Sequence, residues 1–476
     1  MADHGTNGHV APSESPTAPE PEVVVQPPPY PELVEGVAHQ NPIQTISNGT
    51  NGTDEPLIVE DATSLATRYQ NLSLSAQTIH ADDFLNSHQS VAPPMHVSTT
   101  FRYSSNPDDL NPWKNINPNN PHDSHVYSRY TAPNTMRFEA ILTSILHGPV
   151  LTYSSGLSAF HAMLVFLNPR RVAIGGGYHG CHGVIGVLAK LSGLRQLDLD
   201  CADADLGPGD VIHVETPLNP TGEARDLARY AAKARRTGAV LTVDATFAPP
   251  PLLDPFAFGA DVVMHSGTKY FGGHSDMLCG VLAVAPRHAK EWLPKMHMER
   301  LFLGSVMGSL EGWLGIRSLR TLELRVRKQS ADTEEIVRWL AAEKSREEGS
   351  VVGDLVAEIK HASLQVSSEG KELSWLKEQM PNGFGPVFAL YMKDEEDAKR
   401  LPSKLHLFHH ATSLGGVESL VEWRAMSDVG VDKRLLRFSI GVEGWEDLRD
   451  DLIQGFEALA REKPRAAKTV EGNGTG

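Results

Sequence analysis

The sequence predicts an α/β fold, in which a large domain carries a mostly parallel β-sheet and a smaller α+β domain follows it. Between Arg137 and Ala260, helical stretches alternate with short β-branched runs, which is the pattern of βαβ units. From 330 to 460, helices and strands mix without that alternation. The chain has 476 residues, which is too long for a single compact core. We therefore expect two folded domains.

The individual elements follow from runs of apolar residues along the chain. In the large domain, short buried strands of a parallel sheet are expected at Val172–Ile174, Val211–Val214, Ala239–Val243 and Val262–Met264. An amphipathic helix around Leu319–Arg327 leads into the smaller domain. There we expect helices at Asp332–Lys344 and Glu446–Arg461, and strands at Val387–Tyr391 and Leu435–Ile440.

Both ends of the chain differ in composition from these two domains. The first 75 residues are rich in Pro, Glu, Asn, Gly and Thr, and 463–476 is similar, so both are predicted to be disordered. Two Asn-Gly-Thr triplets, at Asn48 and Asn51, match glycosylation acceptors, but we interpret them as chance because no secretory signal is recognised. The Asn/Pro-rich stretch between Tyr103 and His125 is predicted to be a surface loop.

These observations divide the chain into five parts. A disordered extension (1–75) precedes an N-terminal arm and loop (76–125). The large domain (126–320) and the small domain (321–462) follow, and a disordered tail (463–476) ends the chain.

Composition excludes several classes of function. The net charge of −16 provides no basic surface for nucleic acid or for an anionic membrane. The three cysteines, Cys181, Cys201 and Cys279, are too few for a disulfide framework, which fits a reducing compartment. No apolar run is long enough to span a membrane, and no signal pattern opens the chain. We therefore expect a cytoplasmic protein that binds neither nucleic acid nor membrane.

A single lysine carries the strongest chemical signal. Lys269 follows Ser266 and Thr268 and precedes a Gly-Gly turn, in the run His-Ser-Gly-Thr-Lys-Tyr-Phe-Gly-Gly. An amine beside hydroxyl donors, with room for a ligand against the backbone, is what a pyridoxal-phosphate enzyme needs to form its Schiff base and hold the phosphate. Taken alone, such a lysine is more often an ordinary surface residue.

Partners for this lysine lie upstream in the sequence. Asp244 ends the apolar run at Ala239–Val243, where a carboxylate can keep a pyridine nitrogen protonated, although a strand-end or N-cap aspartate is the plainer alternative. The Ser-Ser-Gly turn before Leu157 opens a helical run whose backbone N–H groups suit a phosphate. Tyr178, after three glycines, can stack on an aromatic ring, and Asn219 can donate to a phenolic oxygen.

The ordered combination resembles the Cys/Met-metabolism family of PLP enzymes, the trans-sulfuration group. The resemblance covers roughly 76–460 and includes Val-Ser-Thr-Thr-Phe at 97–101, Tyr-Ser-Arg-Tyr at 127–130, Ser-Leu-Gly-Gly-Val-Glu-Ser at 413–419 and Leu-Arg-Phe-Ser-Ile-Gly at 436–441. It implies the type I fold of PLP-dependent transferases, with a mostly parallel seven-stranded sheet and a smaller C-terminal α+β domain.

The resemblance also implies roles for individual residues. Lys269 would be the Schiff-base lysine, and Tyr178 would assist catalysis as an acid or base while stacking on the cofactor. The other cofactor-binding positions would be Asp244, Tyr127, Arg129, Gly156, Leu157, Asn219, Thr246, Ser266 and Thr268. Substrate would be bound by Arg437, Ser413 and Glu418. Tyr127 and Arg129 would reach the site of a neighbouring subunit, which implies a homotetramer built from dimers that share active sites.

The chain departs from the family at two places, of which the second, a loop that borders the substrate entrance in the family, concerns substrate choice. Many members read Asp-Asn-Thr-Phe where this chain has Ala245 after Asp244. Most members also carry a Pro and a His in the loop at Val421–Asp428, where this chain has neither. The run Tyr178–His182 holds two His and one Cys, but a turn beside the cofactor is favoured over a metal site because no second ligand pair has zinc spacing.

The resemblance favours a carbon–sulfur lyase that acts on cystathionine or a related sulfur amino acid by α,γ- or α,β-elimination. The alternative is γ-replacement on O-acetyl- or O-succinylhomoserine, with a sulfur nucleophile or a carbon or nitrogen nucleophile. A catalytically inactive copy of the family, kept as a scaffold, is the remote third hypothesis.

Overall fold

The computed structural model describes residues 69–85, 90–110, 125–346 and 349–462, all of which belong to the unit that begins at Asn51. Most of the predicted disordered extension, most of the predicted surface loop, and the tail from 463 lie outside the described residues, as do Asn48 and Asn51. Of the predicted extension, 69–75 is described and contains the first residues of a helix.

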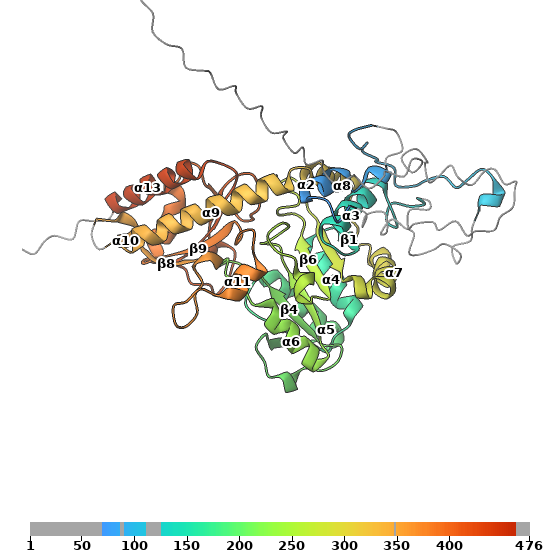
Figure 1. The fold of residues 1–476 in the computed structure, drawn as a ribbon, viewed down its shortest axis with the longest axis horizontal. Helices are drawn as coiled ribbons and strands as arrows, with labels where there is room; N and C mark the ends of the chain where they lie inside the picture. The colour runs from blue at the N-terminus through green and yellow to red at the C-terminus, as the bar shows by residue number, and fades with distance from the viewer. Residues whose placement is uncertain (1–68, 86–89, 111–124, 347–348, 463–476) are drawn as a thin grey trace, which may run out of the picture. The chain divides into compact units, whose positions relative to one another are not determined.

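Helices and strands alternate through the first part of the chain and mix in the second (Figure 1). The helices are α2 (Leu74–His80), α3 (Pro133–Ile145), α4 (Gly156–Leu167), α5 (His179–Ser192), α6 (Leu227–Thr237), α7 (Pro286–Leu303), α8 (Ser309–Leu319), α9 (Leu322–Lys344), α10 (Val351–Leu355), α11 (Ser374–Gln379), α12 (Glu395–Arg400) and α13 (Trp445–Glu462). The strands are β1 (Val150–Tyr153), β2 (Arg171–Ile174), β3 (Arg195–Asp198), β4 (Val211–Glu215), β5 (Val240–Asp244), β6 (Val262–Ser266), β7 (Gly280–Val284), β8 (Val356–Lys360), β9 (Val387–Met392), β10 (His409–His410), β11 (Leu420–Trp423) and β12 (Leu435–Ser439).

The first seven strands form one sheet in the order β1-β7-β6-β5-β4-β2-β3. Strand β7 is antiparallel to both of its neighbours, and the β6-β5-β4-β2-β3 ladder is parallel throughout. The predicted α/β class with a mostly parallel seven-stranded sheet is therefore confirmed. The parallel arrangement places the carboxyl ends of β2, β4, β5 and β6 along one edge, where α/β proteins bind their ligands.

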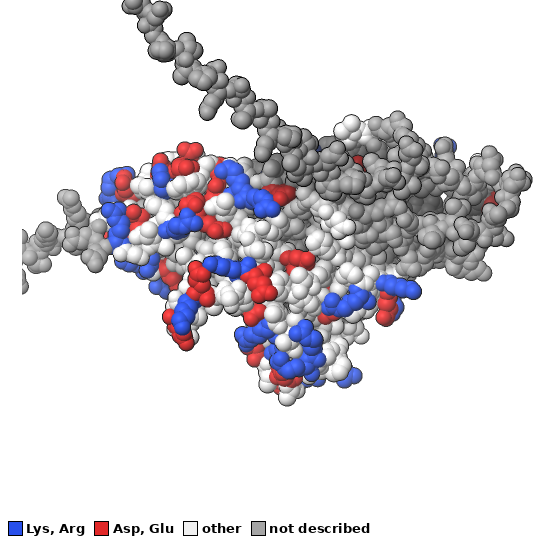
Figure 2. Space-filling model, in the orientation of Figure 1, with Lys and Arg blue, Asp and Glu red and all other residues white. Residues whose placement is uncertain are grey.

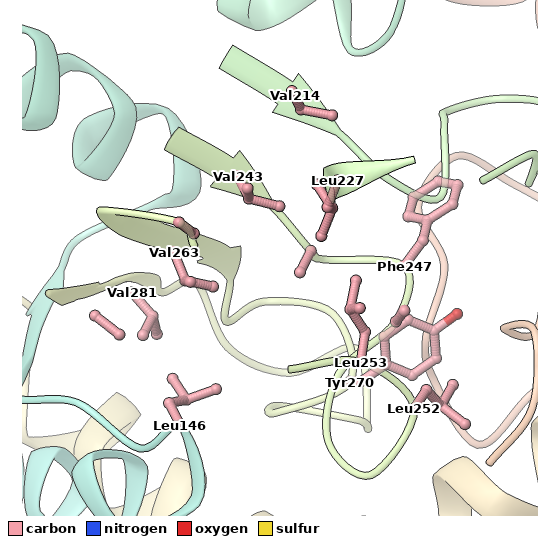
Figure 3. Packing of buried hydrophobic residues seen from close by; sticks show 14 of the residues in the cluster. Leu146, Val214, Leu227, Val243, Phe247, Leu252, Leu253, Val263, Tyr270 and Val281 are labelled. Atoms are coloured by element: carbon pink, nitrogen blue, oxygen red, sulfur yellow. The ribbon is translucent and has the colours of Figure 1, made fainter. Parts of the chain in front are cut away.

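Side chains of the sheet alternate between two buried layers. On β6 and β7, Val263 and Val281 join one hydrophobic cluster while Met264 and Leu282 join another on the opposite face. Figure 3 shows valines from four neighbouring strands pointing to the first face: Val214, Val243, Val263 and Val281. A strand buried on both faces must be apolar at successive positions, which explains the unbroken apolar runs in the sequence.

The second part of the chain folds around its own sheet and core. Its five strands lie in the order β10-β11-β12-β9-β8, with β11, β12, β9 and β8 antiparallel to their neighbours and β10 parallel to β11. Helices α9 and α13 pack on this sheet through a third hydrophobic cluster that includes Ile336, Phe388 and Phe456. The predicted mixture of helices and strands is confirmed for this part.

One long helix connects the two parts. The helices expected around Leu319–Arg327 and at Asp332–Lys344 form a single helix, α9, because the residues between them contain no Gly or Pro to break it. Its first turns bury Leu322 and Val326 in the core of the large sheet, and its later turns bury Ile336 and Leu340 in the core of the small one. The helix is visible in Figure 1 in yellow to orange.

Charged side chains cover the surface around α13, α10 and α6 with both signs interspersed, as Figure 2 shows for one face. Among the described residues, no helix is both long enough and apolar enough to cross a membrane.

Candidate active site

Three strands of the large sheet end in polar residues that meet at one edge. Glu215 ends β4, Asp244 ends β5 and Ser266 ends β6. Glu215 and Asp244 are register partners across the two parallel strands, so their side chains emerge side by side. Hydrogen bonds extend this row, since the Thr246 hydroxyl donates to Asp244 Oδ1 (2.6 Å) and accepts from the Ser266 N–H (2.8 Å).

Lys269 lies in the turn that follows β6 and reaches the second part of the chain. Its Nζ donates to Ser413 Oγ at 2.6 Å. Burial, and to a smaller extent the charge of Arg437, lower the pKa of Lys269 to about 8, while Glu422 opposes both effects. About a tenth of this amine is therefore unprotonated and nucleophilic at pH 7, far more than of an exposed lysine.

A close backbone approach fixes the loop that holds Ser413. Gly415 has a φ of +82°, and a Cβ on it would lie 3.0 Å from the backbone carbon of Lys269. Only glycine combines this conformation with this contact. Ser413 itself has a φ of +83°, and its carbonyl accepts from Arg437 NH2 at 2.9 Å while its hydroxyl accepts from Lys269. Ser413 therefore links the lysine to the arginine, and its left-handed backbone is the kind of strain often found at functional sites.

The start of α4 forms a setting for an anion beside the end of β6. Ser155 caps the helix by accepting from the Ser158 N–H (3.1 Å), and the first N–H groups of the helix, at Gly156 and Leu157, have no intrahelical acceptor. Gly156 packs against Ser266, because an added Cβ would lie 3.1 Å from Ser266 Oγ. A helix N-terminus next to a hydroxyl such as that of Ser266 suits a phosphate. Thr268 lies nearby in sequence, but its hydroxyl accepts from the Cys279 N–H at 3.0 Å and so helps to anchor the turn to β7.

The two carboxylates at the sheet edge, Glu215 and Asp244, are both buried, and the charge of Asp244 acts on Glu215. Asp244 Oδ1 accepts from both the N–H and the hydroxyl of Thr246. Glu215 accepts from the Tyr178 N–H (2.8 Å) through Oε2 and from the Asn219 N–H (2.6 Å) through Oε1. Burial raises the pKa of both groups, that of Glu215 to about 8 with a further contribution from Asp244. Burial and the neighbouring Asp244 carboxylate thus favour the protonated form of Glu215.

Tyr178 stands at the entrance of this row, directly before α5. Its side chain is 38% exposed, and its backbone is tied to Glu215. Burial raises the pKa of its phenol, whereas the charges of Arg424 and Arg437 act in the opposite direction. The preceding Gly177 has a φ of +155°, and a Cβ there would overlap Glu215 Oε2. This close approach explains why the sequence has glycine before the tyrosine.

Arg437 provides a buried guanidinium on the second sheet. It is 5% exposed, lies on β12 and donates to Asn219 Oδ1 (3.0 Å), the Ser413 carbonyl (2.9 Å) and Glu422 Oε2 (2.6 Å). Glu422 is its register partner on β11, so the contact follows from the pairing of antiparallel strands. Burial lowers the pKa of Arg437 to about 10, which leaves it charged at neutral pH. The geometry suits recognition of a carboxylate.

Three predicted residues have contacts outside this cluster. Tyr127 is 43% exposed, and the guanidinium of Arg129 lies 5.4 Å from the centre of its ring and donates to the Leu301 carbonyl (3.1 Å). Glu418 accepts from the Ser275 hydroxyl. None of the three forms a hydrogen bond to Lys269, Asp244 or Arg437 within the described part of the chain, so their roles stay predictions.

The structure adds polar residues that the sequence analysis did not assign. Glu215 was not assigned a role from the sequence, and Glu422 and Arg424 lie within the altered loop at Val421–Asp428. The signal for Glu422 was present, because a carboxylate in the apolar run at Leu420–Val421 requires a buried partner. Over the ranges that are described, no group of three His, Cys, Asp or Glu residues is arranged to hold a metal ion.

Comparison with known proteins assigns the family. Residues 75–457 match the model of the Cys/Met metabolism PLP-dependent enzyme family. The cystathionine gamma-lyase of Saccharomyces cerevisiae is 30% identical over 407 residues, which are 80% of this chain and 97% of that protein. The cystathionine gamma-synthase of Escherichia coli is 32% identical over 397 residues, which are 77% of this chain and 93% of that protein. The crystal structure of cystathionine gamma-lyase from yeast superimposes with a TM-score of 0.71 at 28% identity, covering 82% of this chain and 99% of that one.

The chain therefore belongs to the Cys/Met metabolism family of PLP-dependent enzymes. The resemblance found in the sequence is confirmed, and the structural match confirms the type I fold of PLP enzymes. The relatives of the chain include both a cystathionine lyase and a cystathionine gamma-synthase.

The residues of the site fit the cofactor of this family. Lys269 offers a buried amine of lowered pKa, and Asp244 offers a buried carboxylate for a protonated ring nitrogen. The N-terminus of α4 and the hydroxyl of Ser266 lie together, where a phosphate finds neutral donors. The aldehyde, the ring nitrogen and the phosphate of pyridoxal phosphate thus each have a matching group near this edge of the sheet.

Proposed function

We propose that the protein is a PLP-dependent carbon–sulfur lyase that acts on cystathionine or a related sulfur amino acid by α,γ- or α,β-elimination. The observation that carries the proposal is the Lys269–Ser413–Arg437 contact. It joins a nucleophilic amine to a carboxylate-binding guanidinium through one residue. When bound, pyridoxal phosphate stabilises the negative charge that develops on the substrate's α-carbon.

Arg437 is the group that we propose binds the substrate's α-carboxylate. It is buried and already held by Asn219 and Ser413, so little side-chain entropy is lost when a substrate binds. Fixing the carboxylate beside Ser413 orients the α-carbon toward Lys269, whose amine donates to the same residue.

Lys269 is the proposed proton carrier at the substrate. Its pKa of about 8 makes the free amine a base that accepts the proton from the α-carbon and returns one at a neighbouring carbon. Tyr178 is the proposed acid at the departing sulfur, because its phenol is half-buried and lies within the field of Arg424 and Arg437. Asp244 and Glu215 keep a proton at the sheet edge for the ring nitrogen.

The same residues support a second proposal, γ-replacement on an O-acylated homoserine. The 32% identity to the E. coli gamma-synthase favours it about as much as the 30% identity to the yeast gamma-lyase favours elimination. Both reactions begin with removal of the α-proton, and they differ in whether a nucleophile adds afterwards.

We also propose that the enzyme is a cytoplasmic homotetramer built from dimers that share active sites. Support comes from Tyr127 and Arg129. Neither side chain forms a hydrogen bond to Lys269, Asp244 or Arg437 of the same chain. An aromatic ring and a guanidinium in that position suit the phosphate of a neighbouring subunit's cofactor.

Product analysis distinguishes the proposals. Purified protein is incubated with L-cystathionine, and separately with O-acetyl- or O-succinylhomoserine plus cysteine. Cysteine and 2-oxobutyrate from the first mixture establish γ-elimination, and homocysteine and pyruvate establish β-elimination. Cystathionine formed only in the second mixture contradicts the lyase proposal and supports replacement. Protein without the visible absorbance of bound cofactor would support the inactive copy.

A further inference from the structure

A second buried arginine lies behind the carboxylate-binding residue. Arg424 begins the short 3₁₀ helix Arg424–Met426 after β11 and is only 4% exposed. Its NH1 donates to Glu422 Oε2 at 2.9 Å, and its NH2 donates to Asp428 Oδ2 at 3.1 Å. Burying a guanidinium costs free energy unless the charge is paired. The contacts of Arg424 should therefore show what its charge does in the site.

Glu422 is the residue that Arg424 shares with Arg437. The same oxygen, Glu422 Oε2, accepts from Arg437 NH2 at 2.6 Å and from Arg424 NH1 at 2.9 Å, while Oε1 accepts from the Ser427 hydroxyl. Glu422 is itself 2% exposed. One buried carboxylate therefore faces two guanidinium groups, and its charge is divided between them.

The balance of charge decides whether Arg437 can take a substrate. With Glu422 as its sole charged neighbour, Arg437 would form a closed ion pair of no net charge, which attracts a further carboxylate weakly. Arg424 adds one positive charge to this pair, and its other partner, Asp428, is more exposed and better solvated. The three buried groups then carry a net positive charge that one substrate carboxylate neutralises.

Two further features connect Arg424 with the site. Its charge reaches both Tyr178 and Arg437, since it acts to lower the pKa of each. Its Nε is buried and has no hydrogen-bond partner in the described ranges of the chain. A purely structural arginine would be expected to use all of its buried donors.

We propose that Arg424 is a positioning residue for the substrate carboxylate: it takes up part of the negative charge of Glu422, which both arginines contact, and so keeps the positive charge of Arg437 available. The inference rests on the proposed function, because it assumes that Arg437 binds the carboxylate of an amino acid. It assigns a role to the Val421–Asp428 loop, in which a buried arginine controls affinity without touching the substrate.

The test is the affinity for glycine, which carries a single carboxylate and no leaving group. Glycine is titrated into cofactor-loaded protein, and binding is followed by the change in visible absorbance. Arg424→Met should raise the apparent Kd for glycine about tenfold to a hundredfold, which lies within the usual range of coupling between a ligand and a group that does not touch it. The visible absorbance of the cofactor and the Tm should stay close to those of the wild type, and Arg424→Lys should recover part of the affinity.

A double variant separates this effect from a general loss of structure. Arg424→Met combined with Glu422→Gln removes both charges, so Arg437 is again free and Kd should return to within about threefold of the wild-type value. This variant also tests the proposal if the single variant does not fold, because it leaves no unpaired buried carboxylate. Arg137→Met is the matched control: Arg137 is equally buried and bonds to Asp82, not to this cluster, and should leave Kd unchanged.

Each remaining outcome contradicts the proposal in its own way. An unchanged Kd for Arg424→Met, or a double variant as weak as the single one, would show that Arg424 does not act through Glu422. Weakened binding of cystathionine with unchanged binding of glycine would show that Arg424 contacts a distal acid group directly. Wild-type protein that takes up no cofactor, or takes it up and binds no amino acid, overturns the proposed function itself and the inference with it.

Discussion

Replacing Arg437 by methionine tests the carboxylate site most directly. The side chain is 5% exposed and has three acceptors, in Asn219, Ser413 and Glu422. Methionine fills a similar volume but offers no donor, so the substrate loses one charge-assisted contact. Such a contact contributes about 1.5–3 kcal/mol, which corresponds to an increase in KM of about tenfold to a hundredfold.

The fold should survive this change. Glu422 keeps its bonds to Arg424 and Ser427, so the substitution leaves no buried carboxylate without a partner. The effect should therefore appear mainly in KM, while kcat at saturating substrate falls much less, because the interaction is made with the bound ground state as well as the transition state.

Steady-state kinetics with whichever substrate proves active give both parameters. Arg437→Lys is the matched variant, because it keeps the charge and loses the planar pair of donors, and it should lie between the wild type and Arg437→Met. A KM that does not change in Arg437→Met, at wild-type Tm, would refute the assignment of Arg437 to the substrate carboxylate.

Three other predictions concern the cofactor side of the site. Lys269→Ala should abolish both turnover and the visible absorbance of covalently bound cofactor, and an active variant would contradict the central assignment. Because the pKa of Lys269 is about 8 and its free amine is the reactive form, cofactor loading of cofactor-free protein should accelerate as pH rises and level off above about pH 8; an exposed lysine would keep accelerating toward about pH 10.4. Gly177→Ala should lower the Tm and weaken cofactor binding, since its Cβ would overlap Glu215 Oε2, whereas Gly176→Ala, which meets no atom, is the control with little effect.

Much of the fold was accessible from local patterns. The runs at Val172–Ile174 and Val211–Val214 lie within β2 and β4, because a strand buried on both faces has to be apolar at successive positions. Strand β3 was missed, since it lies at the sheet edge and reads Arg-Gln-Leu-Asp, with no apolar run to mark it. The continuity of α9 was also missed, because its apolar stripe changes from one core to the other along its length.

Part of the site could be predicted for the same reason. Lys269, Asp244 and Ser266 stand in local motifs next to strand ends, and the sheet topology brings their strands together. Ser413 and Arg437 required a contact across more than a hundred residues, which no spacing rule supplies. Their proximity to Lys269 was available only through resemblance to a family, and the structure now provides the atoms that make it.

The sequence by itself determined the α/β class, the family and the residue types of the chemistry, because periodicity and short motifs depend on neighbours along the chain. The tertiary structure alone decided how charge is distributed at the site. The lowered pKa of Lys269, the raised pKa values of Glu215 and Asp244, and the division of Glu422 between Arg424 and Arg437 all arise from burial and from contacts between separate strands. Electrostatic interactions depend on distance and solvent exclusion in three dimensions, and neither quantity can be read from the order of residues.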